Sequence, residues 1–338
     1  MAKKTYGTIL IGDEERIGRS YEKFLAQPID QEFPMDGEDG YSANQTTIGK
    51  PVAITGPGTF FGNAQRTLRF EPSPAGGWFF HRQDLVAAMP ILVSVNNIWT
   101  TVRNIVLCSG SPHNYMRMVE HIIALKVGMG VDNVMIRVDS GDPPLFDRGS
   151  ADLVEAIESA GIVSSQRPAT CLTVKEPVTI EGPNGSFLTF LPAEGKSCKL
   201  FVDCAVDFKS AIGKQRIRFP VTGSIFKQGA FARTNTTLWK MIFSKTIGQI
   251  FADVRNLGYT TKNIQVAGRW RYINKPGFIH NGKSLEPAWH RAALDLLAAI
   301  ALIDRGRLAG TIISYKSGHA LDVQMIKELY QRDLFLEM

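Results

Sequence analysis

The sequence of 338 residues lacks long apolar runs and has few cysteines. No stretch reaches the roughly eighteen apolar residues that a membrane-spanning helix requires. The first twenty residues hold only a short apolar patch before a charged stretch, which does not fit a secretory signal. The four cysteines, Cys108, Cys171, Cys198 and Cys204, form no Cys-x-x-Cys pair, so neither a disulfide framework nor a structural zinc site is expected. These absences predict a protein of the reducing cytoplasm, without a transmembrane segment.

Nucleic-acid-binding motifs are also missing, so no nucleic-acid partner is expected. The chain has 38 Lys and Arg against 32 Asp and Glu, which gives a net charge of +6. Such a balance is typical of a solvated basic surface, or of a surface that attracts an anionic ligand or a membrane. Local excesses of basic residues occur at 213–219 and 262–275, and these segments are expected to meet the anionic ligand.

The hydrophobic pattern predicts strands and helices in alternation. From Gln45 onward, short segments rich in Val, Ile, Thr and aromatic residues indicate strands. Apolar residues three and four apart predict a helix over 114–130 that glycines close. A strand then follows, and a short amphipathic helix is expected over 149–162, with Ser150 as its cap and Gly161 as its stop.

A second cycle of the same kind begins near Gln166. Its first part contains a hairpin whose turn is the Pro-Asn-Gly at 183–185. Longer helices are expected over 237–258 and 288–306. The element order therefore predicts an α+β protein with two units of similar size, although no residue-level repeat is visible.

The predicted boundaries follow from this pattern. Residues 1–44 are interpreted as an N-terminal extension and linker, because they are polar and rich in Gly and Asp toward their end. Residues 45–165 form the first α+β domain and residues 166–338 form the second.

Three short segments place chemically useful side chains together. Glu120 and His121 are adjacent, His290 and Asp295 lie on one predicted helix, and His319 follows a glycine. Zinc-assisted hydrolysis needs such a set: protein ligands, an open position for water, and a base and an acid nearby. A lone histidine is more often a surface or core residue, so none of these segments is specific by itself.

Four segments in order carry a family resemblance: 45–62, 118–151, 231–237 and 315–322. They contain a Gly-rich turn, a Val-Glu-His helix with a Gly-x-Asp-Asn strand, an Ala-Arg-Thr segment and a Lys-Ser-Gly-His loop. Together they resemble the UDP-3-O-acyl-N-acetylglucosamine deacetylases, which are zinc-dependent amidases of lipid A biosynthesis.

The resemblance implies hydrolysis of the N-acetyl amide of an acylated UDP-amino sugar. Glu120 would be the general base that takes a proton from water, and His319 the general acid that protonates the leaving amine. His121, His290 and Asp295 would bind Zn2+. The expected partner is that substrate or a related anionic ligand.

The resemblance also implies supporting residues. Thr234 would polarise the amide oxygen opposite the metal. Lys316 would raise the local positive potential. Gly318 would allow the backbone to bring the His319 imidazole close without a clash of a Cβ atom.

The family architecture would be two similar domains, each a small β-sheet with two helices packed on one face. The domains would stack helix to helix in a β-α-α-β sandwich, with the site at the seam between them. A monomer is expected, and a peripheral contact with a membrane stays open.

The zinc-binding helix departs from the family pattern. His290 and Asp295 are five residues apart, whereas the family has the corresponding pair four apart. Residues five apart diverge by about 140° on a regular α-helix. Both side chains can therefore reach one ion only if a π-bulge inserts a residue, or if the helix begins after His290.

Other departures suggest a damaged site. Phe60 replaces a histidine of the Gly-rich turn, residues 235–237 lack the family's aromatics, and Asp322 replaces an asparagine. A further helix aspartate is also missing. The alternative is a catalytically degenerate homologue that binds a nucleotide sugar, an acyl chain or a protein partner without hydrolysis. An unrelated α/β enzyme with an anion-binding Gly-rich loop is a third interpretation.

Overall fold

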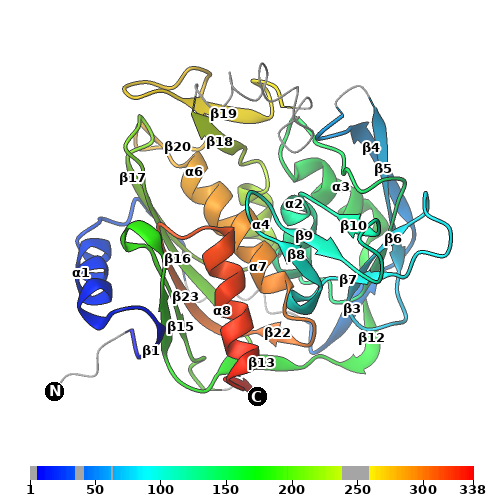
Figure 1. Cartoon of the computed structure of the whole chain (residues 1–338), viewed down its shortest axis with the longest axis horizontal. Helices are drawn as coiled ribbons and strands as arrows, with labels where there is room; N and C mark the ends of the chain where they lie inside the picture. Colours follow the sequence, from blue (N-terminus) through cyan, green and yellow to red (C-terminus); the bar gives the residue numbers. More distant parts are fainter. Residues whose placement is uncertain (1–5, 35–41, 62–63, 196, 238–258) are drawn as a thin grey trace.

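The computed structural model of the chain describes residues 6–34, 42–61, 64–195, 197–237 and 259–338. The two largest sheets lie on opposite sides of the molecule, and helices lie between them (Figure 1). In the part of the chain that the structure describes, no helix combines the length and the apolar character that a membrane crossing demands.

The first large sheet has five strands, and its central strand is buried on one face. In spatial order the strands are β4 (Val52–Pro57), β5 (Gln65–Pro72), β11 (Val134–Val138), β6 (Trp78–Arg82) and β7 (Ile91–Leu92). Strand β11 runs antiparallel to β5 and parallel to β6. In β11, Val134, Ile136 and Val138 are buried, while the alternate residues are half-buried, as period two requires.

The second large sheet has seven strands, and both of its edge strands come from the N-terminal part of the chain. Its spatial order is β1 (Thr8–Ile11), β14 (Val178–Glu181), β15 (Phe187–Leu191), β23 (Gly310–Tyr315), β16 (Leu200–Asp207), β17 (Lys214–Pro220) and β2 (Gln31–Glu32). Strands β14 and β15 form the hairpin that the sequence predicts, and the turn at Pro183–Gly185 joins them.

The remaining strands of the described residues form smaller sheets. A three-stranded sheet has β10 (Tyr115–Met116), β9 (Val106–Cys108) and β8 (Ile98–Thr100), and another has β22 (Arg307–Leu308), β13 (Cys171–Val174) and β24 (Phe335–Glu337). The two-stranded pairs are β12 (Ile162–Pro168) with β3 (Asn44–Ile48), β18 (Thr234–Thr237) with β19 (Ile264–Ala267), and β20 (Ile279–His280) with β21 (Lys283–Ser284).

The helices of the described residues are mostly short. They are α1 (Glu14–Leu25), α2 (Glu120–Gly128), α3 (Ala151–Ala160), α4 (Gly223–Gly229), α6 (Glu286–Trp289), α7 (Leu297–Ala301) and α8 (His319–Gln331). Helix α2 packs against α7, whereas α6 and α8 pack on the seven-stranded sheet. The helix predicted over 114–130 is confirmed from Glu120 onward but is wrong at its start, where Tyr115–Met116 form β10. The helix predicted near α3 is confirmed, and Gly161 ends it with a φ of 71°. Most of the helix predicted over 237–258 lies outside the described residues.

A π-helical turn, His290–Leu296, connects α6 to α7 without a break, and we call it the π segment. Its backbone bonds run from residue i to residue i+5, so it holds one residue more per turn than the α-helix on either side. Of the two arrangements that would let His290 and Asp295 face one ion, the inserted π turn is the one present.

Residues 6–34, which belong to the predicted N-terminal extension, contain a helix and two strands that join the seven-stranded sheet. Asp13 caps α1 by accepting a hydrogen bond from the amide of Arg16. Ile17, Tyr21 and Phe24 then bury one face of α1 against the outer face of the seven-stranded sheet. Helix α1 therefore lies on the face opposite α6 and α8, in addition to the two helices expected on one face. The division at residues 44 and 165 stays a prediction.

The cysteine prediction is also wrong. Cys171 and Cys198 form a disulfide with Cα atoms 5.8 Å apart, while Cys108 and Cys204 are free thiols. The two bonded cysteines are separated by 27 residues, so no local spacing reveals the pair.

Candidate active site

Helix α2 positions Glu120 and His121, because it begins at Glu120. The Glu120 side chain is buried, and its carboxylate accepts a hydrogen bond from the backbone amide of Ile105. Ser150, expected as the cap of α3, makes no side-chain cap bond there and donates instead to the carbonyl of His121 at 3.1 Å. The start of α2 is thus held from two sides.

The π segment positions His290 and Asp295 on the same side of the helix. Nδ1 of His290 and Oδ2 of Asp295 are 3.5 Å apart. Such a contact between residues five apart follows from the i to i+5 geometry of the segment. A carboxylate at one ring nitrogen orients a histidine whose other nitrogen faces a metal or a substrate.

The imidazoles of His121 and His290 meet although they are 169 residues apart in the chain. Their Nε2 atoms lie 3.1 Å apart. The hydroxyl of Thr234, from β18, lies 3.0 Å from Nε2 of His290 and 3.5 Å from Nε2 of His121. Three polar atoms from three separate elements therefore converge on one point.

His319 completes the cluster from the start of α8. Its Nε2 lies 3.8 Å from Oε1 of Glu120 and 3.6 Å from Oδ1 of Asp295. The structure thus brings together all the residues predicted as base, acid, metal ligands and oxyanion stabiliser.

The protonation states follow from burial and from neighbouring charges. Burial, with the nearby His290, lowers the pKa of His121 to about 3, so His121 is neutral at pH 7. Burial raises the pKa of Glu120, and the nearby His319 only partly opposes this. Burial alone would lower the pKa of His319, but the carboxylates of Asp295 and Glu120 raise it. Burial would also raise the pKa of Asp295, yet the two histidines hold it below its usual value.

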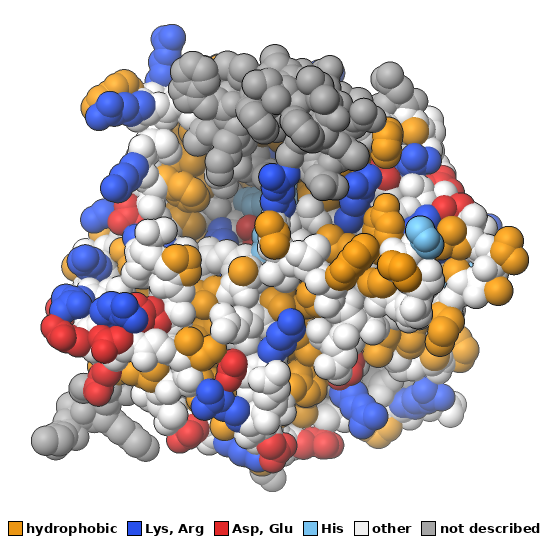
Figure 2. Space-filling view, in the orientation of Figure 1, with side chains coloured by type: hydrophobic (Ala, Val, Ile, Leu, Met, Phe, Trp, Pro, Cys, Tyr) orange, Lys and Arg blue, Asp and Glu red, His pale blue; other side chains and the backbone are white. Residues whose placement is uncertain are grey.

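A cavity of about 500 Å³ opens onto this cluster. Asp295 and His319 line it, together with the cationic side chains of Arg103, Arg291 and Lys316. A hollow with histidine at its base and Lys or Arg side chains at its rim is visible on the face shown in Figure 2. The cavity therefore combines an acid–base cluster with positive charge.

Sequence reasoning missed a buried ion pair beside the cluster. Arg291 pairs with Asp322, and its guanidinium also donates to the hydroxyl of Ser317 at 2.7 Å. This links the π segment to the loop that carries His319. In the sequence Asp322 is recognisable only as a departure from the family pattern. It is 31 residues from Arg291, so no local spacing indicates that the two form an ion pair.

Tyr259 was also missed. Burial raises its pKa, and the negative charge of Glu120 adds to this effect. Its hydroxyl lies 3.9 Å from the sulfur of Met118, so the ring stands next to the start of α2.

The structure changes two expectations about supporting residues. Gly318 has an extended backbone with φ −152°, and a Cβ there would meet no atom within 4 Å, so no close approach requires glycine. In the basic segment 213–219, Arg216 is not available to an anion, because it pairs with Asp203 in the interior. Lys316, predicted to add positive charge, lines the cavity and donates to the carbonyl of Asn184 at 2.8 Å.

The residues present fit a zinc ion in part. Two tetrahedral zinc ligands at 2.0–2.1 Å have nitrogens about 3.3 Å apart, close to the 3.1 Å between His121 and His290. The neutral state of His121 is the one that binds metal. However, no group of three or more His, Cys, Asp or Glu in the described ranges is arranged to hold a metal. The fit is therefore good for the imidazole pair, and Asp295 as third ligand stays a prediction.

A buried carboxylate, a second proton-transfer group and a pair of facing imidazoles in one cluster are the arrangement typical of metal-assisted hydrolases. Comparison with known proteins gives the same class. The sequence pattern of the UDP-3-O-acyl N-acetylglycosamine deacetylase family matches residues 45–331, and the chain belongs to this family.

Several relatives share this family name. The chain is similar to UDP-3-O-acyl-N-acetylglucosamine deacetylase of Cellvibrio japonicus, with 26% identity over 85% of this chain and 90% of the relative. Identity to the Idiomarina loihiensis protein of that name is 28%, over 84% and 89% of the two chains. For Brucella ovis the values are 27%, 88% and 99%. The predicted family is thus confirmed, and so is the prediction of a hydrolase of the deacetylase class.

Proposed function

We propose that this protein is a zinc-dependent deacetylase that removes the N-acetyl group of an acylated UDP-amino sugar in lipid A biosynthesis. The observation that carries the proposal is the 3.1 Å approach of His121 and His290, with Glu120 adjacent in α2. The names of the relatives in Cellvibrio, Idiomarina and Brucella support the choice of substrate.

Glu120 acts as general base in this proposal. Burial raises its pKa above that of an ordinary glutamate, which makes the carboxylate a stronger proton acceptor. The amide of Ile105 fixes the direction of the carboxylate. Glu120 takes a proton from the attacking water.

His319 acts as general acid. Its raised pKa keeps the imidazole protonated at higher pH than an ordinary histidine. Asp295, 3.6 Å away, stabilises the protonated ring. His319 then gives its proton to the nitrogen of the amino sugar as the amide bond breaks. Thr234, whose hydroxyl lies 3.0 Å from Nε2 of His290, donates to the carbonyl oxygen of the amide.

His121 and His290 would hold the zinc ion, with Asp295 as the third ligand. When bound, the ion supplies a Lewis acid that polarises the amide and makes water more acidic. The π segment supports this assignment because it turns His290 and Asp295 to one side.

The cationic rim suits the anionic part of the substrate. Arg103 and Lys316 line the cavity and would attract a diphosphate, whereas Arg291 is paired with Asp322 in the interior. We expect a cytoplasmic monomer.

Zinc content and acetate release test the proposal together. Protein purified without chelator should hold close to one zinc per chain, and it should release acetate from UDP-3-O-acyl-N-acetylglucosamine. A chelator should remove both, and added zinc should restore both. Protein that stays inactive with added zinc but still binds the nucleotide sugar would establish the alternative, a homologue that binds without hydrolysis.

A further inference from the structure

The basic segment 262–275 lies apart from the catalytic cavity, because none of its residues lines that cavity. Most of it belongs to the loop between β19 and β20, which stands at the upper left edge of the molecule (Figure 1). No Asp or Glu occurs anywhere from residue 259 to residue 285. The positive charge of this loop is therefore available to a partner outside the catalytic cavity.

The loop begins with a tight turn that its own hydrogen bonds hold in shape. The amide of Ile273 donates to the carbonyl of Val266 at 2.9 Å, and the amide of Gly268 donates to the carbonyl of Arg271 at 2.9 Å. The side chain of Asn274 accepts from the amide of Val266 at 2.8 Å and donates to two carbonyls earlier in the chain. The turn thus presents its outward side chains in a fixed arrangement.

These outward side chains are cationic and apolar. Trp270, at the tip, is 83% exposed, and the guanidinium carbon of Arg269 lies 4.9 Å from the centroid of its ring. Arg271, Ile273 and Lys275 are also exposed, because they alternate along the chain with half-buried residues. Among the described residues, no carboxylate forms an ion pair with the Lys and Arg of this turn.

The turn between β16 and β17 enlarges this surface. The amide of Ala211 donates to the carbonyl of Gly268 at 3.0 Å, so the two turns lie against each other. Phe208, Lys209 and Lys214 are exposed on the second turn. In Figure 2, Lys and Arg side chains stand beside apolar ones at the upper left, where Figure 1 has these turns.

We propose that these two turns, residues 208–214 and 268–275, form a docking surface for a membrane that contains anionic phospholipids. The Trp270 ring enters the head-group layer, where tryptophan is enriched in membrane proteins. The surrounding Lys and Arg side chains attract the phosphates of the lipids. A single-stranded nucleic acid fits less well, because it is bound along a groove with several stacking rings, whereas here one indole projects from the tip of a turn.

Docking of this kind places the catalytic cavity beside the bilayer, because Phe208 also lines that cavity. Asp207 precedes Phe208 and is the nearest acid in the chain to this turn. It is half-buried and accepts a hydrogen bond from Tyr315, so it opposes the lipid charge only weakly. The inference does not rest on the proposed function, because membrane binding needs neither zinc nor turnover.

Sedimentation of the full chain with lipid vesicles tests the docking surface. One vesicle consists of phosphatidylcholine alone, and the other of equal parts of phosphatidylcholine and phosphatidylglycerol. More protein should sediment with the anionic vesicle, and added salt should reduce that fraction because it screens exposed charges. Equal binding to both vesicles, or none to either at low salt, overturns the proposal.

Substitutions on the first turn locate the contact. Arg269→Gln and Arg271→Gln should each weaken binding to the anionic vesicle about fivefold, the effect of one charge near such a bilayer. Trp270→Ala should weaken it about tenfold, because a large apolar ring no longer leaves water. All three residues are exposed, so the variants should unfold at the temperature of the parent chain. Variants that sediment like the parent chain contradict the proposal.

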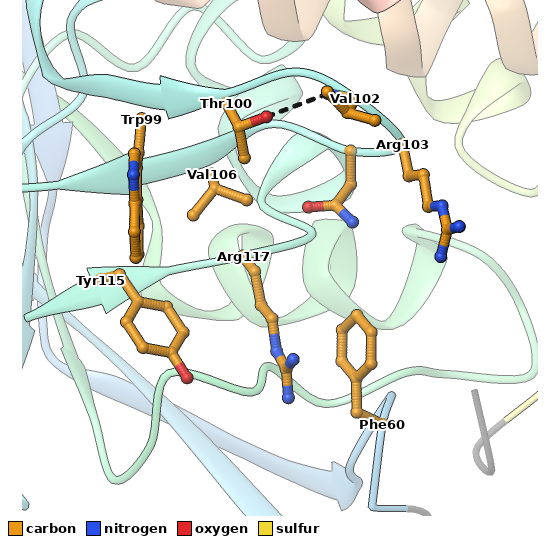
Figure 3. A pocket seen from close by; sticks show the side chains of 9 residues that line it. Phe60, Trp99, Thr100, Val102, Arg103, Val106, Tyr115 and Arg117 are labelled. Carbon is orange, nitrogen blue, oxygen red and sulfur yellow. Dashed lines mark hydrogen bonds between the residues drawn. The ribbon is translucent and has the colours of Figure 1, made fainter. Parts of the chain in front are cut away.

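Two control variants change comparable side chains elsewhere. Trp99 is 57% exposed and packs edge to face on Tyr115, with ring centroids 6.0 Å apart (Figure 3). Lys23 is exposed on α1. Trp99→Ala and Lys23→Gln should each keep vesicle binding within about twofold of the parent chain. Binding of a single-stranded oligonucleotide without binding of anionic vesicles would assign the surface to nucleic acid and overturn the proposal.

Discussion

Helix α2 and the π segment both deliver side chains to the site, but with different backbone geometry. In α2 the two useful residues, Glu120 and His121, are adjacent, and adjacent residues on an α-helix point about 100° apart. Glu120 therefore faces Ile105 and His319, while His121 faces His290. In the π segment the useful residues, His290 and Asp295, are five apart and face the same way.

This difference shows how one site assigns separate tasks. A regular helix places neighbouring residues in different surroundings, so one can serve as a buried carboxylate and the next as a facing imidazole. The π segment instead places two residues in the same surroundings, which suits groups that share a ligand or a proton. The following substitutions and deletions test whether α2 separates the roles of Glu120 and His121 while the π segment combines those of His290 and Asp295.

Glu120→Gln tests the α2 side. It should lower kcat by about 10³-fold, in the range that general base catalysis contributes, while zinc content stays unchanged. Glu22→Gln, on the exposed face of α1, is the control and should keep full activity. A Glu120→Gln enzyme with ordinary turnover would show that another group takes the proton.

His121→Ala and His290→Ala compare the two helices directly. Each removes one member of the imidazole pair, so each should weaken zinc binding by about 100-fold or more. Competition with a chromophoric chelator measures the affinities. A large loss in one variant with none in the other would mean that the two imidazoles do not share an ion.

Asp295→Asn tests the π segment alone. It should reduce zinc affinity by about 10- to 100-fold, whether the carboxylate binds the ion or orients His290. Asp333→Asn is the control, since the Asp333 side chain is exposed on the surface. Unchanged zinc affinity in Asp295→Asn would remove this residue from the site.

Deletion of Ala293 from the π segment should have a smaller effect than the substitutions above. Without Ala293 the segment can close into a regular α-helix. His290 and Asp295 are then four positions apart, and their side chains still point within about 40° of each other around the helix axis. We expect zinc content to stay near that of the parent chain, with stability lowered by no more than about 2 kcal/mol for the lost buried methyl group. Zinc content and thermal unfolding measure both.

Helix α2 is a regular α-helix, so it contains no inserted residue that a deletion could remove. Loss of Ala124 would rotate the rest of α2 by about 100° and expose its buried face, so the chain should not fold. Equal tolerance of the two deletions would contradict the assigned difference between the helices.

The elements with local signals were predictable from sequence. Apolar periodicity and terminal glycines located α2 and α3, and Pro-Asn-Gly located the β14–β15 hairpin. The five-residue spacing of His290 and Asp295 restricted a shared face to two possibilities, an inserted π residue or a helix that begins after His290, and the structure has the inserted residue.

Features that depend on distant partners were not predictable. The apolar face of α1 is short, and the sheet that covers it comes mainly from residues after 177. The disulfide of Cys171 with Cys198 and the ion pair of Arg291 with Asp322 each join residues more than 25 apart. No pattern within one element indicates such contacts.

The N-terminal segment has a further consequence for the seven-stranded sheet. Strand β1 pairs with β14 at one border, and strand β2 pairs with β17 at the other. These two edge strands are short: β1 has four residues and β2 has two residues. Short edge strands of this kind offer little backbone to which another chain could add a strand, so residues 8–32 leave the largest sheet with few backbone groups open to extension.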